Sequence, residues 1–197
     1  MSKLSEIFAK QAELVDGLRP IYLKNGFNLH AKPFPWPLDD RHYQEEFRLL
    51  AWRFTEELQE ARAEMIILRE SKETLREEIA DAFHFLVELG LAIGMAPDSG
   101  LPPLETIESL PTAHWKPHLP FWFCVSSMAA LMVSFRQRPW RTDNRLTWTA
   151  RVHQAFNYLL IDFYRLCKGL GISSDELFSA YMAKNAVNHQ RKEDALR

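Results

Sequence analysis

The sequence predicts an all-α protein, on three observations. Only seven of the 197 residues are glycine, and no run of alternating apolar and polar residues marks a half-buried strand. Apolar residues instead recur every three or four positions over long stretches, which places them on one face of a helix. We therefore expect a bundle of about six helices in a single domain spanning 1–197, with a proline-rich insertion or linker at about 96–120.

The first two helices are delimited by proline and aspartate. A helix over about 4–18 is expected to end before Pro20, and the prolines at 33, 35 and 37 favour an extended connector over 19–38. Asp39 or Asp40 is a suitable N-cap for the second helix. The apolar stripe of that helix continues to about residue 68, so the helix is long.

A break near Ser71 separates the second helix from a third. Thr74 and Glu77 form a possible capping box at the start of the third helix. Gly94 and Pro97 close this helix, because glycine commonly follows a helix end and proline cannot continue one.

The second half of the chain predicts three more helices, at about 121–137, 143–169 and 174–193. Pro139 ends the first of them, and Ser173 with Glu176 forms a capping box before the last. Six prolines between 96 and 120 leave room there for at most one short helix.

Composition excludes several classes of function. Lys and Arg number 24 against 26 Asp and Glu, so neither a nucleic-acid track nor binding to an anionic membrane is expected. The longest apolar stretch, 121–135, is shorter than the roughly 20 residues that span a bilayer. Cys124 and Cys167 lie in apolar helical stretches without a spacing motif, which predicts buried free thiols in a cytoplasmic protein.

The helices at 121–137 and 143–169 carry more apolar side chains than one small bundle readily covers. This excess predicts a homodimer, and a larger monomeric core is the alternative. The side chains concerned are Phe121, Trp122, Phe123, Met128, Met132, Trp148, Phe156, Tyr158 and Phe163.

Two acidic motifs of the form E-E-x-x-(E/D), at 56–60 and 77–81, lie on the second and third predicted helices. Residues three apart share a helix face, so Glu57 pairs with Glu60, and Glu78 with Asp81. Antiparallel packing would bring the four carboxylates together. Their mutual repulsion favours a hard divalent cation such as Mg²⁺, with Mn²⁺ also possible. The alternative is two solvated acidic faces.

His84 lies one turn after Asp81. It could hydrogen-bond a ligating carboxylate, or it could be satisfied within the helix packing. Near the C-terminus Lys184, Asn188 and Arg191 share one helix face, with Asn185 alongside. Two cations and two amides suit a nucleotide, whereas an exposed helix end would also favour cations.

Together these motifs resemble the all-α nucleoside triphosphate pyrophosphatases, the superfamily of MazG and the dimeric dUTPases. The third-helix motif resembles the E-x-x-D-x-x-H-F pattern of dimeric dUTPases and phage dCTP/dUTP pyrophosphatases, with Glu78, Asp81, His84 and Phe85 in its positions. The C-terminal motif resembles their K-N-x-x-N-x-x-R pattern. The resemblance covers roughly 40–95 and 155–192, and the Gly-Tyr sequence that usually follows Arg191 is missing.

The resemblance implies a dimeric helical bundle that binds Mg²⁺ through Glu57, Glu60, Glu78 and Asp81. It also implies hydrolysis of a deoxypyrimidine triphosphate, dUTP first and dCTP second, to a monophosphate and pyrophosphate by a metal-activated water. Lys184 and Arg191 would hold phosphates, and Asn185 and Asn188 the sugar or phosphate. A generic MazG-like pyrophosphohydrolase and a non-catalytic helical interaction protein are the alternatives.

Gln11 stands where the family uses an amide for the base. Because an amide presents both a donor and an acceptor, Gln11 could accept uracil or cytosine by flipping. The resemblance therefore implies that dUTP and dCTP are closer to each other as substrates than either is to dATP.

Overall fold

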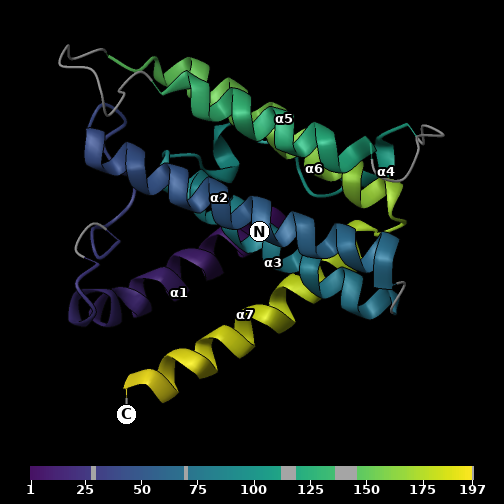
Figure 1. The fold of residues 1–197 in the computed structure, drawn as a ribbon, viewed down its shortest axis with the longest axis horizontal. Helices are drawn as coiled ribbons and strands as arrows, with labels where there is room; N and C mark the ends of the chain where they lie inside the picture. The colour runs from purple at the N-terminus through teal and green to yellow at the C-terminus, as the bar shows by residue number, and fades with distance from the viewer. Residues whose placement is uncertain (28–29, 69–70, 112–118, 136–145, 197) are drawn as a thin grey trace.

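The computed structural model describes residues 1–27, 30–68, 71–111, 119–135 and 146–196, and within these residues it contains helices and no β-strand (Figure 1). The all-α prediction is confirmed, with six long helices and one short one in the described part of the chain. The α-helices are α1 (Lys3–Lys24), α2 (Arg41–Ala63), α3 (Lys72–Ala92), α4 (Thr106–Ser109), α5 (Leu119–Ser134), α6 (Thr149–Gly169) and α7 (Ser174–Leu196). A π-helical turn, η1 (Glu64–Leu68), extends α2, and a 3₁₀ turn, η2 (Pro97–Ser99), follows α3.

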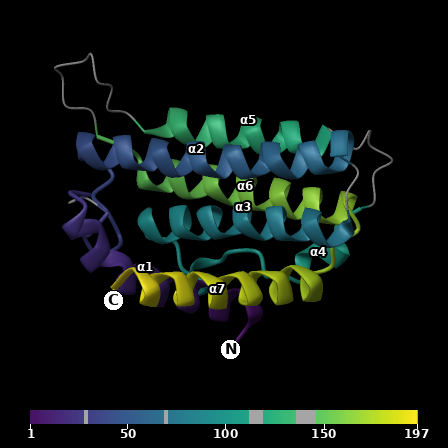
Figure 2. The same cartoon turned by 60° about the horizontal axis from the view of Figure 1, so that its bottom comes forward.

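The helices form three layers (Figures 1 and 2). The pair α2 and α3 lies in the middle, the pair α5 and α6 covers one side of it, and α1 with α7 covers the other. A short connection joins α2 to α3, so the two run antiparallel. The arrangement places α7 beside α3, although the two are far apart in the sequence.

Aromatic side chains fill the core between these layers. Phe83 of α3 stacks on Phe163 of α6 with ring centroids 5.2 Å apart, and both are fully buried. Gly90 allows the close approach of neighbouring helices, because a Cβ atom there would lie 2.8 Å from Cζ of Phe156 and 3.2 Å from Cζ of Phe8. The core is thus continuous from α1 through α3 to α6.

The predicted end of the first helix before Pro20 is wrong, because α1 continues to Lys24 with Pro20 inside it. Proline removes one helical hydrogen bond, here to the carbonyl of Asp16. Both Pro20 and Asp16 are exposed, so water can satisfy that carbonyl. The extended connector therefore begins later than predicted.

The start of α3 also differs from the prediction. Ser71, rather than Thr74, is the N-cap, and its Oγ accepts a hydrogen bond from the Thr74 N–H at 3.2 Å. The Thr74–Glu77 capping box is therefore wrong. The box predicted from Ser173 and Glu176 is confirmed, since the Glu176 N–H donates to Ser173 Oγ and the Ser173 N–H donates to Glu176 Oε2. Asp40 is confirmed as the cap of α2.

The predicted start of α6 near 143 is also wrong over the described residues. Residues 146–148 are not helical, and α6 begins at Thr149. Tertiary contacts hold this segment: the Thr147 N–H donates to Asp39, and Gln44 Nε2 donates to Thr147 Oγ1 at 3.2 Å. Pro139 and residues 142–145 lie outside the described residues.

Both cysteines are buried and free, as predicted. Among the described helices, none combines the length and the apolar character that a bilayer crossing requires.

Candidate active site

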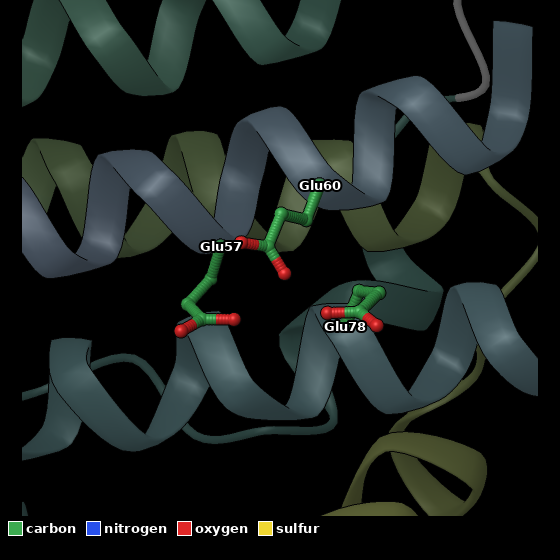
Figure 3. A group of neighbouring side chains, drawn as sticks. All are labelled: Glu57, Glu60 and Glu78. Carbon is green, nitrogen blue, oxygen red and sulfur yellow. The ribbon is translucent and has the colours of Figure 1, made fainter. Parts of the chain in front are cut away.

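Three of the four predicted carboxylates converge between α2 and α3. One oxygen each from Glu57, Glu60 and Glu78 lies within 4.8 Å of the other two. Figure 3 shows Glu57 and Glu60 extending from α2 toward Glu78 on α3. The i, i+3 spacing on α2 and the antiparallel packing of α3 produce this arrangement, as the sequence pattern predicts.

The carboxylates repel one another electrostatically. Burial first, and then the negative charges of Asp81, Glu60 and Glu78, raise the pKa of Glu57 to about 7. The pKa of Glu78 is raised by burial first and then by Asp81 and Glu60. Because Asp81 affects both groups, it belongs to the same acidic cluster, which we define as Glu57, Glu60, Glu78 and Asp81. Such a cluster is most stable with a cation among its oxygens.

One cation of the protein already lies at this cluster. Lys184 Nζ of α7 is 2.5 Å from Asp81 Oδ2, and both side chains are mostly buried. Its positive charge lowers the pKa of Glu57 and Glu78. The contact therefore joins the C-terminal motif to the acidic motifs, which spacing alone did not establish.

A pocket of about 430 Å³ opens beside the cluster between α1, α3 and α7. We call it the central pocket. Its charged end, next to the cluster, carries Glu57, Asp81 and Lys184, and Asn188 and Arg191 of α7 also line the pocket. Its other end is lined by apolar residues and by buried polar groups, namely Leu14, Leu18, Ile21, Phe85, Gln11, Tyr22, His84 and Glu88. One end thus suits phosphates and a metal ion, and the other suits a flat, hydrogen-bonding ring.

Buried polar side chains form a connected network at the second end. Gln11 Nε2 donates to Glu88 Oε2 at 3.3 Å. Gln11 Oε1 accepts from the Tyr181 hydroxyl at 2.7 Å and lies 2.9 Å from His84 Nδ1. The His84 ring also stacks on Tyr181 with centroids 4.0 Å apart. Of the two roles considered for His84, this favours the one within the helix packing.

The predicted C-terminal residues divide between two sides of α7. Lys184, Asn188 and Arg191 line the central pocket. Lys184 and Arg191 also line a neighbouring pocket of about 610 Å³ between α7 and the start of α3. Asn185 instead is buried toward α1, in a shallow pocket with Lys10 and Glu13. The structure therefore brings three of the four together and places Asn185 apart from them.

Glu88 and Tyr181 are not among the site residues that the sequence predicts. Glu88 is 7% exposed, and burial raises the pKa of its carboxyl group to about 7. A signal for it was present, since Glu88 is the one charged residue in the otherwise apolar stretch 85–92. Tyr181 gave no such signal, because a tyrosine on an apolar face is usually a core residue.

The sequence of the chain also matches a known protein family. A family model described as dUTPase matches residues 66–195, about two thirds of the chain. The matched region contains Glu78, Asp81 and the C-terminal motif through Arg191. Neither the curated proteins nor the solved structures gave a match.

Proposed function

The chain belongs to the all-α dUTPase family, and we propose that it hydrolyses dUTP to dUMP and pyrophosphate with Mg²⁺, or alternatively Mn²⁺, as cofactor. Family membership makes it a nucleoside triphosphate pyrophosphohydrolase. The observation that carries the substrate assignment is the central pocket, whose acidic and cationic end adjoins a buried amide and imidazole.

The acidic cluster would hold the metal. Its oxygen ligands are of the type that Mg²⁺ prefers, and a bound cation would offset the burial and the mutual repulsion that raise the pKa of Glu57 and Glu78. When bound there, Mg²⁺ would neutralise phosphate charge and lower the pKa of a bound water.

The cationic side chains of α7 would hold the triphosphate. Lys184, Asn188 and Arg191 all line the central pocket, and Lys184 contacts Asp81 of the cluster. Arginine and lysine bind phosphate oxygens through charge-assisted hydrogen bonds. Asn185, buried on the other side of α7, would support the helix from behind and contact substrate only after a rearrangement.

The base would lie at the other end of the pocket. Phe85, Leu14 and Ile21 supply apolar surface, and Gln11 supplies the amide that the sequence motif assigned to the base. Gln11 is 3% exposed and fixed by three hydrogen-bonding neighbours. Its amide therefore cannot reverse unless the hydrogen bonds of those neighbours change too. This restricts the free reversal that would let Gln11 bind uracil and cytosine equally well.

A panel of triphosphates tests this proposal. We expect pyrophosphate, rather than single phosphates, to be released with Mg²⁺ from dUTP and to a lesser extent from dCTP, with dATP and dGTP far slower. Measurement of pyrophosphate and of the nucleotide product for each substrate decides the matter. Similar rates for purines and pyrimidines would indicate a generic MazG-like enzyme, and no turnover at all would indicate a helical interaction protein.

We also propose that the protein is a homodimer. Several of the aromatic residues expected at an interface, such as Phe156 and Phe163, are buried in the core instead. Trp122 on α5 and Trp52 on α2, however, are 52% and 61% exposed. Exposed tryptophans are frequent at interfaces. Analytical ultracentrifugation at micromolar concentration should give twice the 23.0 kDa chain mass, and a sedimenting monomer would contradict the dimer.

We further propose that residues 1–197 act as one domain in the cytoplasm. The central pocket takes residues from α1, α2, α3 and α7, and free thiols persist in a reducing compartment.

A further inference from the structure

The buried network behind the central pocket links a carboxyl group to an imidazole. Glu88 contacts Gln11, and Gln11 contacts both Tyr181 and His84 through the same oxygen. His84 is 5% exposed, and its second ring nitrogen, Nε2, is buried without a hydrogen-bond partner among the described residues. Because His84 lines the pocket, this unpaired atom is suited to meet a ligand.

The orientation of the Gln11 amide determines which nitrogen of the His84 ring carries the proton. Burial lowers the pKa of His84 to about 4, so at neutral pH the ring carries one proton and has one donor and one acceptor nitrogen. If Nδ1 donates to Gln11 Oε1, Nε2 must be an acceptor. If the Gln11 amide is reversed and its NH₂ donates to Nδ1, Nε2 must be a donor.

Glu88 decides between these two arrangements. Ionised, its carboxylate only accepts, and it therefore holds the Gln11 NH₂ toward itself and the Gln11 oxygen toward Tyr181 and His84. Protonated, it can donate to the Gln11 oxygen and allow the amide to reverse. In the reversed state Gln11 donates to the Tyr181 hydroxyl oxygen, and that hydroxyl can donate to the carbonyl of Ile7, which lies 3.5 Å away. Every hydrogen bond between members of the network thus has a donor and an acceptor in both states, and His84 Nε2 is left for a ligand.

We propose that Glu88, acting through Gln11, sets whether His84 Nε2 offers an acceptor or a donor to the pyrimidine base of the substrate. His84 is then a specificity-determining residue and Glu88 a positioning residue. The inference rests on the proposed function, since it assumes that the base occupies the inner end of the central pocket.

The two pyrimidines differ at the atom that this device would recognise. N3 of uracil carries a hydrogen and donates, whereas N3 of cytosine is an unprotonated acceptor. An acceptor Nε2 matches uracil and faces cytosine with two opposed lone pairs. A donor Nε2 has the reverse preference. A buried polar group left unpaired discriminates more strongly than a difference in size.

The surroundings of Glu88 allow it to change charge near neutrality. Tyr22 of α1 and His84 of α3 line the central pocket with Glu88, as do the cations Lys184, Arg191 and Lys192 of α7. Tyr181 of α7 also interacts electrostatically with Glu88. On its other side lie Arg53 of α2, which is paired with Glu56, and His30, which is paired with Glu46.

Burial raises the pKa of both Tyr22 and Tyr181, so neither ionises near neutrality. The pKa of Glu88 is raised to about 7 by the same cause. Ionised Glu88, and with it preference for uracil, is therefore expected above that pH, and the preference relaxes below it.

The tautomer of His84 tests the inference without substrate. In protein labelled with ¹⁵N-histidine, the two ring nitrogens of His84 should show the Nδ1–H tautomer at pH 8.5, with the Nε2–H form increasing as the pH falls to 6. A His84→Gln variant identifies the signals, and His30 is followed separately in the same spectra. Glu88→Gln, which cannot ionise, should abolish the pH dependence. A tautomer that stays constant over this range in the wild-type protein would overturn the inference.

The kinetic readout is the ratio of kcat/KM for dUTP to kcat/KM for dCTP. Ionisation of the triphosphate and of metal-bound water affects both substrates alike, so it cancels in this ratio. We expect the ratio to fall about tenfold between pH 8.5 and 6, corresponding to one mismatched hydrogen bond. Glu88→Gln should flatten the profile. Glu13→Gln, a neutralisation of an exposed α1 carboxylate paired with Lys10, should leave it unchanged.

The possible results distinguish a failure of the role proposed for Glu88 from a failure of the proposed function. Hydrolysis of both pyrimidines with a ratio that does not vary with pH contradicts the role of Glu88 and leaves the proposed function standing. Absence of pyrophosphate release from both substrates contradicts the proposed function itself, and the tautomer measurement then still decides whether Glu88 controls His84.

Discussion

Replacing Glu57 by glutamine is expected to lower kcat/KM for dUTP by about a thousandfold, because the variant removes a charged ligand from the acidic cluster while keeping its shape. Glu57 interacts with all three other members of the cluster, since Asp81, Glu60 and Glu78 each raise its pKa. Initial rates of pyrophosphate release at saturating Mg²⁺ measure the effect. Glu78→Gln should behave in the same way.

Glu56→Gln is the matched control. Glu56 is the neighbouring residue in the same E-E-x-x-E motif, but its carboxylate accepts from Trp52 Nε1 at 2.6 Å and from Arg53 at 2.9 Å, away from the cluster. Its replacement should change the rate less than threefold, the size of change expected for a surface polar residue. Equal losses in Glu56→Gln and Glu57→Gln would sink the proposed metal site.

Calorimetry separates metal binding from turnover. A carboxyl group with a pKa of about 7, such as Glu57, is partly protonated at neutral pH, so metal binding must displace a proton. We therefore expect Mg²⁺ titration at pH 7 to release protons, with a smaller release at pH 8. Glu57→Gln should bind Mg²⁺ more weakly at both pH values.

The acidic cluster could be predicted from the sequence because its information is local. Two motifs with i, i+3 spacing on neighbouring helices determine which carboxylates share a face, and the structure brings Glu57, Glu60 and Glu78 together accordingly. The helix boundaries were less predictable where tertiary contacts or solvent override local preference. Pro20 inside α1 and the non-helical segment at Thr147 are the two clearest cases.

The inner end of the central pocket could not be predicted for a related reason. Gln11, Glu88 and Tyr181 come from α1, α3 and α7, and no spacing within one helix indicates that they meet. The same holds for Asn185, which shares a sequence motif with Lys184 but lies on a different side of α7. Contacts between distant segments depend on the packing of whole helices, which a single sequence does not encode locally.

Lys184→Met should have opposite effects on turnover and on metal affinity. Lys184 Nζ lies 2.5 Å from Asp81 Oδ2, so its ammonium repels a cation that approaches the cluster. Removing that charge should strengthen Mg²⁺ binding about tenfold at pH 8, where Glu57 is largely ionised. Turnover should nevertheless fall about a hundredfold, because the substrate phosphates lose a charge-assisted donor.

Calorimetric titration with Mg²⁺ and steady-state kinetics with dUTP measure the two effects on the same preparation. Lys168→Met is the control, because it removes the same charge at a site away from the cluster. Lys168 Nζ donates to the Glu108 carbonyl oxygen at 3.2 Å. A role for Lys184 confined to holding α7 against α3 predicts that both metal affinity and turnover decrease, since loss of the Asp81 contact would loosen the cluster. The sign of the change in Mg²⁺ affinity therefore distinguishes a phosphate-binding lysine, which the metal displaces from Asp81, from a purely structural one.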